Sequence, residues 1–236
     1  MSHAEIRPDT PANTPAVSPT ASTPVSRQPA RQIKSGPNRR LLPWLGVAAL
    51  ALLLLIGLGW WFAPRELHGV LIQSPNQADD FTLMSSTGEP MQLSDFRGQY
   101  VALFFGYTYC PDVCPTTLND LQVMVDALGP RRAENVQVLM ISVDPERDTV
   151  EQLQTYLRHF DPSFIGMTGT VEEIQPIASS FGIYFEKHED TGLVDHTGAV
   201  TIIDPEGYVR LIIPKGLDGP TGEEMAQDLT YLMRRG

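Results

Sequence analysis

Two cysteines and one histidine carry the chemistry that this sequence offers. Cys110 and Cys114 are the only cysteines of the chain, and three residues separate them. They follow an apolar segment and open a segment with helical periodicity, which places both thiols near a helix N-terminus. The dipole and free N–H groups of such a terminus lower thiol pKa values, and a spacing of four puts both thiols on one face. Such a pair can exchange disulfides or bind a soft metal ion.

A structural disulfide is the alternative use of the two cysteines in an oxidising compartment. The loop it would close holds only three residues. Closing so short a loop constrains the unfolded chain little, so it would stabilise the fold little. We therefore favour a chemical role, and the residues alone leave open which one.

His196 lies just before an apolar segment, residues 199–203, near the C-terminal end of the chain. In a thioredoxin topology the loop before this strand folds over the cysteines, so His196 could supply a third ligand. Two thiolates and one imidazole suit Cu(I) and, with further ligands, Cu(II). Spacing alone does not distinguish such a ligand from a histidine without a metal.

The elements around these residues predict an α/β, thioredoxin-like fold: a central mixed sheet flanked by helices, with an N-terminal hairpin. Residues 101–107 and 136–143 are almost continuously apolar, as expected of central strands covered on both faces. Turn residues separate two short strand pairs. The first pair is 81–84 with 91–93, and the second is 199–203 with 208–213.

Helices are expected between and after these strands. Apolar spacings of three and four predict one over residues 116–128. A second begins near Thr149, with Asp148 placed to cap it. Two more are predicted over 171–180 and 222–234.

The N-terminal third has a different character. Residues 1–40 contain seven prolines and no apolar periodicity, so we expect a disordered cytoplasmic tail. Residues 41–63 carry no charge and are long enough for a transmembrane helix, and basic residues gather before rather than after them. We read residues 64–79 as a linker and 80–236 as the folded domain outside the cytoplasm. A cleaved signal peptide is the competing interpretation of this segment.

The charge of the chain limits its partners. The sequence has 28 acidic and 17 basic residues, a net charge of −11. This balance argues against binding to nucleic acid, whose phosphates demand a basic surface. We expect the charge to keep the domain soluble.

Three motifs resemble the Sco/SenC family of copper-handling proteins. They are Cys110-Pro-Asp-Val-Cys114-Pro, Ser142-Val-Asp-Pro-Glu-Arg-Asp-Thr149 and Val194-Asp-His-Thr197, in this order behind one apolar segment. The resemblance extends from about residue 67 to the C-terminus. It implies a thioredoxin-like copper chaperone, rather than an enzyme, that assists assembly of the binuclear copper site in cytochrome c oxidase subunit II.

By this resemblance, Cys110, Cys114 and His196 are the copper ligands, and Asp144 is a neighbouring group or an occasional ligand. The implied partners are subunit II, a periplasmic copper donor protein and a thiol reductant protein. The implied location is the bacterial inner membrane with the domain in the periplasm; the alternative is the mitochondrial inner membrane, with the domain in the intermembrane space.

Other functions remain as alternatives. Thioredoxin-type oxidoreductases have a cis-proline before the strand that here begins at Ala199, whereas this chain has Asp195-His196-Thr197. That departure favours copper over a thiol–disulfide oxidoreductase that reduces subunit II. A thiol peroxidase is disfavoured because Pro111 stands where peroxiredoxins place a threonine. A redox or copper sensor is a further alternative, and it would require the N-terminal tail, residues 1–40, to contribute to function.

Overall fold

The computed structural model describes residues 42–61, 67–216 and 218–235. Residues 42–61 and the domain that begins at residue 67 are described separately. The predicted disordered tail, residues 1–40, lies outside the described residues.

The first helix, α1 (Leu42–Trp61), occupies most of the predicted membrane segment, residues 41–63. Its described side chains, residues 44–59, are exposed. None of the helices in the described part of the chain has both the length and the hydropathy of a membrane span.

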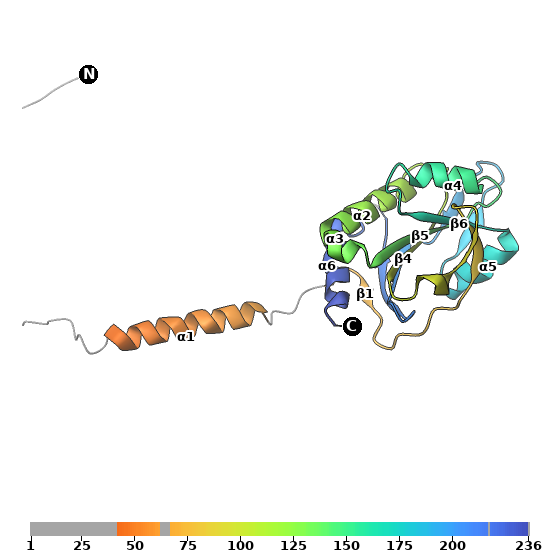
Figure 1. Cartoon of the computed structure of the whole chain (residues 1–236). Coiled ribbons are helices and arrows are strands. Elements are labelled where there is room, and N and C mark those ends of the chain that lie inside the picture. Colours follow the sequence, from red (N-terminus) through yellow and green to blue (C-terminus); the bar gives the residue numbers. More distant parts are fainter. Residues whose placement is uncertain (1–41, 62–66, 217, 236) are drawn as a thin grey trace, which may run out of the picture. The chain divides into compact units, whose positions relative to one another are not determined.

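The domain is built around a mixed eight-stranded sheet with the order β1-β10-β9-β4-β5-β6-β2-β3 (Figure 1). β4 pairs in parallel with β5, and β5 with β6, whereas the other pairs are antiparallel. A separate two-stranded sheet holds β7 and β8. The strands are β1 (Val70–Leu71), β2 (Thr82–Ser85), β3 (Pro90–Gln92), β4 (Tyr100–Gly106), β5 (Val136–Ser142), β6 (Ile165–Thr168), β7 (Phe185–Lys187), β8 (Val194–His196), β9 (Ala199–Ile203) and β10 (Val209–Pro214).

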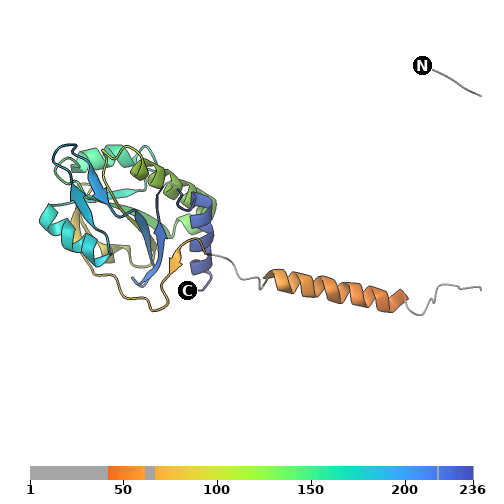
Figure 2. The same ribbon diagram turned by 180° about the vertical axis from the view of Figure 1, so that it is seen from behind.

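Helices cover both faces of this sheet. The helices of the domain are η1 (Leu93–Phe96, a 3₁₀ turn), α2 (Val113–Leu128), α3 (Pro130–Ala133), α4 (Val150–Leu157), α5 (Val171–Ser180) and α6 (Gly222–Met233). α2 packs against α6 on one side of the sheet, and α5 lies on the opposite side in both views (Figures 1 and 2). The predicted α/β architecture with central strands, N-terminal hairpin and flanking helices is therefore confirmed.

Side chains along β4 point alternately to the two faces of the sheet, and both faces are covered by helices. Every residue of β4 is buried, as predicted for a strand covered on both faces. Phe105 packs against Phe181 at the end of α5, with ring centroids 5.9 Å apart. Its neighbour Gly106 faces Cys114 of α2 on the other side. Successive side chains thus serve opposite layers, because the side-chain period of a strand is two.

Two local predictions need correction. Thr149, not Asp148, caps α4, since its side chain accepts a hydrogen bond from the Gln152 N–H. Part of the predicted linker, residues 64–79, also belongs to the sheet: β1 pairs with β10, and Gln77 forms a bridge with Tyr208. The segments that make the β1–β10 pairing and the Gln77–Tyr208 bridge are too short for a hydrophobic period to be recognised in the sequence.

Candidate metal centre

The two cysteines occupy the turn between β4 and α2. Cys110 lies in the loop, and Cys114 is the second residue of α2. The Cys110 N–H donates to the Tyr107 carbonyl at 3.3 Å, which bends the loop back toward the strand. The Cys114 N–H donates to the Cys110 Sγ at 3.4 Å. The sulfur thus satisfies one of the amide groups that a helix start leaves without an intrahelical partner.

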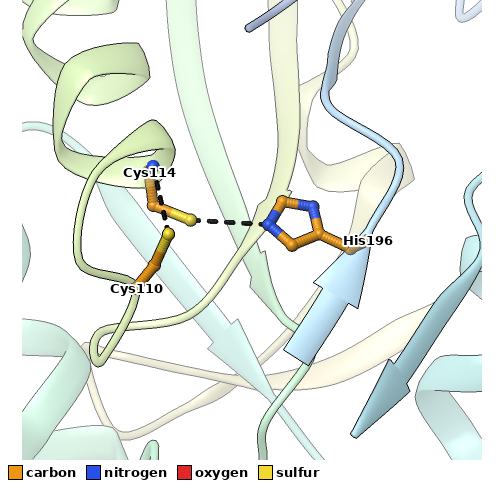
Figure 3. A group of neighbouring side chains, drawn as sticks. All are labelled: Cys110, Cys114 and His196. Carbon is orange, nitrogen blue, oxygen red and sulfur yellow. Dashed lines mark hydrogen bonds between the residues drawn. The ribbon is translucent and has the colours of Figure 1, made fainter. Parts of the chain in front are cut away.

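His196 reaches the thiols from the last position of β8, as Figure 3 shows. Its Nε2 lies 3.6 Å from the Cys114 Sγ. The two sulfurs and one imidazole nitrogen all lie within 4.8 Å of one another. The structure therefore brings together the three side chains expected to bind a metal, although the histidine is 82 residues away from Cys114.

The three groups differ in their access to solvent. Cys114 is completely buried, whereas Cys110 and His196 are half-buried. Both cysteines are free thiols in this structure. An ion or a partner's thiol can therefore approach the cluster from the side of Cys110 and His196.

The pKa values of the two thiols are shifted in opposite directions. A hydrogen bond from the Cys114 thiol lowers the pKa of Cys110 to about 3, and the His196 ring and backbone N–H groups contribute while burial opposes them. The same hydrogen bond, together with burial, raises the pKa of Cys114. At neutral pH the pair therefore holds one thiolate, at Cys110, and one proton, on Cys114. Binding a metal through both sulfurs releases that proton.

Aromatic rings fix the orientation of the imidazole. The rings of Tyr107 and Phe104 lie edge-on to His196, with centroids 6.0 and 6.3 Å away. The Tyr107 hydroxyl accepts a hydrogen bond of 3.2 Å from the Val194 N–H, two residues before the histidine. Tyr107 therefore both packs on the ring and holds the strand that carries it.

Asp148 contributes to the site in a way that the sequence did not reveal. Its buried carboxylate accepts hydrogen bonds from the Thr108 N–H and hydroxyl at 3.0 and 2.6 Å and from the Ser142 hydroxyl at 2.7 Å. Burial raises the pKa of Asp148, against the effect of these hydrogen bonds. The carboxylate ties the loop that leads to Cys110 to the end of β5. From the sequence, the place of Asp148 just before a helix had suggested a helix cap instead.

Asp144 is buried beside the site but is not part of the three-residue cluster. Its Oδ1 accepts from the Lys187 ammonium at 2.9 Å, and its Oδ2 pairs with the Arg147 guanidinium. With both oxygens held by cations, its expected role as a neighbouring group fits this arrangement better than a role as a ligand.

The fold and this cluster define a class: a thioredoxin-like protein in which a strand-borne imidazole completes a dithiol at a helix start. The chain belongs to the SCO1/SenC family, whose model matches residues 71–234.

Individual relatives agree with this assignment. A putative copper-binding protein of Stutzerimonas stutzeri is 35% identical over 142 residues, which cover 58% of this chain and 70% of that protein. The mitochondrial SCO1 homolog of Homo sapiens is 38% identical over 148 residues, covering 61% of this chain and 48% of the relative. The chain thus spans only about half the length of the human relative.

Solved structures show the same fold. Arabidopsis thaliana ScoI with copper bound is 33% identical and superimposes with a TM-score of 0.62, covering 68% of this chain and all of that one. Apo Sco1 from Thermus thermophilus is 36% identical with a TM-score of 0.62, covering 72% of this chain and 99% of that one.

Proposed function

We propose that this protein binds copper through Cys110, Cys114 and His196 and delivers it to cytochrome c oxidase subunit II during assembly of the binuclear copper site. The observation that carries the proposal is the convergence of two sulfurs and one imidazole nitrogen within 4.8 Å. Soft sulfur ligands select Cu(I), and the added nitrogen accommodates Cu(II). Relatives named as copper-binding or solved with copper bound support the same cargo.

A copper titration tests the binding. The full-length chain, reduced and purified in detergent, is titrated with Cu(I) against a competing chelator, beside Cys110→Ser and His196→Ala. We expect one tight equivalent whose affinity falls at least roughly tenfold in each variant, since even residues that only support a ligand change affinity by that factor. His188→Ala is the matched control, because His188 follows β7 directly but contacts Asp195 rather than the thiols. Equal affinity in wild type and His196→Ala would refute the ligand assignment.

Delivery is tested separately from binding. The copper-loaded protein is mixed with the apo copper domain of subunit II, and the visible absorption of the binuclear site is followed. Transfer should require the loaded wild-type chain and should fail with His196→Ala. Retention of copper by this protein in the presence of the apo domain would exclude a donor role.

Thiol–disulfide exchange is the second candidate, favoured by the thiolate at Cys110 and the adjacent Cys114. The Cys110 thiolate would attack a disulfide of subunit II and form a mixed disulfide, and Cys114 would then displace the substrate thiol. The substrate gains two electrons, Cys110 and Cys114 become a disulfide, and a thiol reductant protein restores them. This activity should survive His196→Ala, whereas copper delivery should not.

We also propose that residues 41–63 anchor the chain in a membrane, with residues 1–40 in the cytoplasm. The support comes from the sequence: residues 41–63 form an uncharged apolar segment that extends beyond both ends of α1, with basic residues on its N-terminal side. The bacterial inner membrane, with the domain in the periplasm, is the proposed site. Alkaline carbonate extraction should leave the chain in the membrane pellet, and protease added to spheroplasts should digest the domain; a chain released by carbonate would contradict the anchor.

A further inference from the structure

The three proposed ligands come from parts of the domain that are held differently. Cys110 and Cys114 lie at the junction of β4 and α2, two elements of the main domain. His196 sits on the β7–β8 sheet, whose strands pair with each other and not with the eight-stranded sheet. Beyond the short connection from His196 to β9, the position of the imidazole relative to the thiols therefore depends on side-chain contacts that hold β7 and β8 against the domain.

One such contact is an ion-pair cluster of Asp144, Arg147 and Lys187. Asp144 lies two residues after the end of β5 and is buried, with 1% of its surface exposed. Lys187 is the last residue of β7, and its ammonium lies 2.9 Å from the Asp144 Oδ1. Arg147 pairs with the other oxygen of Asp144 and also donates to the Gly192 carbonyl, in the turn between β7 and β8. The cluster thus contacts the small sheet at two points, one on β7 and one in the turn between β7 and β8.

The strand register relates this cluster to the histidine. Phe185 pairs with His196, and Lys187 pairs with Val194. Because side chains alternate along a strand, all four of these residues share one face of the small sheet, the face that turns toward the domain. Lys187 is two residue pairs away from the pair that contains His196, with only Glu186 and Asp195 between them, on the side where the imidazole must meet the thiols.

A buried carboxylate is costly unless it is paired, so Asp144 holds its two cations firmly. From this arrangement we infer that Lys187, with Arg147, is a positioning residue for the proposed metal site: through Asp144 it fixes β8 so that His196 reaches the thiols. None of the three cluster residues contacts the metal in this scheme. The inference rests on the proposed copper site and adds the device that aligns its third ligand.

The test uses Lys187→Met in the full-length chain, which keeps the side-chain stem and removes the charge. Cu(I) affinity is measured by chelator competition, and the Cu(II) complex is examined by electron paramagnetic resonance. We expect a loss of affinity of about tenfold, as for other residues that orient a ligand, and weaker nitrogen hyperfine coupling from His196. Lys187→Arg should restore both values because it retains the ion pair.

Glu146→Gln is the matched control. Glu146 also pairs with Lys187, at 2.6 Å, but it is 70% exposed and leaves the Asp144 contact intact. It should bind copper with the wild-type affinity and spectrum. Lys187→Met with wild-type affinity and hyperfine coupling would overturn the inference while leaving the copper site standing. A wild-type chain that binds no copper would instead refute the proposed function.

Discussion

At the residue scale, the neighbours of Cys110 stabilise its thiolate and lower its pKa. The Cys114 N–H donates to its sulfur at 3.4 Å, and the Cys114 thiol, the His196 ring and backbone N–H groups lower its pKa. Cys114, buried and hydrogen-bonded to that thiolate, keeps its proton. The loop and first turn of α2 therefore hold two thiols whose pKa values are shifted in opposite directions.

Alkylation of the metal-free protein should report this difference. Because the pKa of Cys110 is lowered to about 3, its thiolate is present throughout the neutral range and is lost only as the pH falls toward that value. The rate of reaction with iodoacetamide should be nearly constant between about pH 5 and 8, where an ordinary cysteine would react roughly tenfold faster per pH unit. Mass spectrometry should locate the first adduct at Cys110.

Cys114→Ala removes the strongest donor to that sulfur. In this variant the rate should become dependent on pH within the same range. A rate that rises steeply with pH in the wild-type chain would contradict the assignment of the thiolate to Cys110.

Gly106, at the end of β4, allows α2 to approach the sheet at the site. A Cβ at this position would lie 2.5 Å from the Phe104 ring and 3.1 Å from the Cys114 Sγ. Both neighbours are completely buried, so neither can move away easily.

Gly106→Ala should therefore lower the free energy of unfolding by about 1–3 kcal/mol, the usual cost of overpacking a core. Denaturant unfolding measures the loss. Gly88→Ala is a useful comparison at a turn, where the added Cβ meets no atom but a positive φ of 90° opposes it. A Gly106→Ala chain as stable as wild type, with unchanged copper affinity, would show that α2 can shift outward freely.

At the scale of elements, the segment that leads into the domain is fastened by a buried carboxylate. Asp228, on α6, accepts hydrogen bonds from the His68 N–H at 3.0 Å and the Gly69 N–H at 2.8 Å. These contacts hold the chain just before β1, the edge strand that pairs with β10. α6 thus carries out two tasks: it packs on α2 and it secures the N-terminal edge of the sheet.

Asp228→Ala should release this segment, since it leaves two amide groups without their acceptor. We expect a loss of about 1–3 kcal/mol in the free energy of unfolding. Hydrogen exchange should accelerate most at residues 68–72. Copper affinity should change little, because Asp228 does not contact the cluster of thiols and imidazole. Uniformly faster exchange across the domain would indicate general destabilisation instead.

At the scale of the whole molecule, the proposed copper ion links two parts of the domain. It would join the β4–α2 junction to the small sheet of β7 and β8, where His196 lies. A ligand that binds only the native state stabilises it by mass action, by about 2.7 kcal/mol at a free concentration one hundred times its Kd.

Copper loading should therefore raise the Tm of the wild-type chain and slow hydrogen exchange in residues 185–196 more than in β4 or β5. Removal of the metal with a strong chelator should reverse both effects. His196→Ala should lose the protection of residues 185–196 even if the two thiols still retain some copper. Equal protection in both proteins would mean that the metal does not bridge the two parts.

The sequence by itself determined the layered α/β fold and the dithiol. Continuous apolar runs predicted β4 and β5, and turn residues predicted the two hairpins. The apolar run before the cysteines and the helical periodicity after them placed both near one helix start. These features depend on neighbours along the chain, so local periodicity and turn chemistry reveal them. The family motifs then supplied His196 as the third partner, which spacing alone left open.

Only the tertiary structure decided how that histidine is held. β7 and β8 are three-residue strands, too short for their alternation to be recognised, and their placement depends on Tyr107, Asp144 and Lys187. Asp148 looked like a helix cap, yet it binds a loop 40 residues away. Contacts of this kind are made between segments distant in sequence, and the cost of burying a charge becomes visible only when its partners are known. For that reason the reactive groups could be predicted from the sequence, whereas their alignment became visible only in the folded domain.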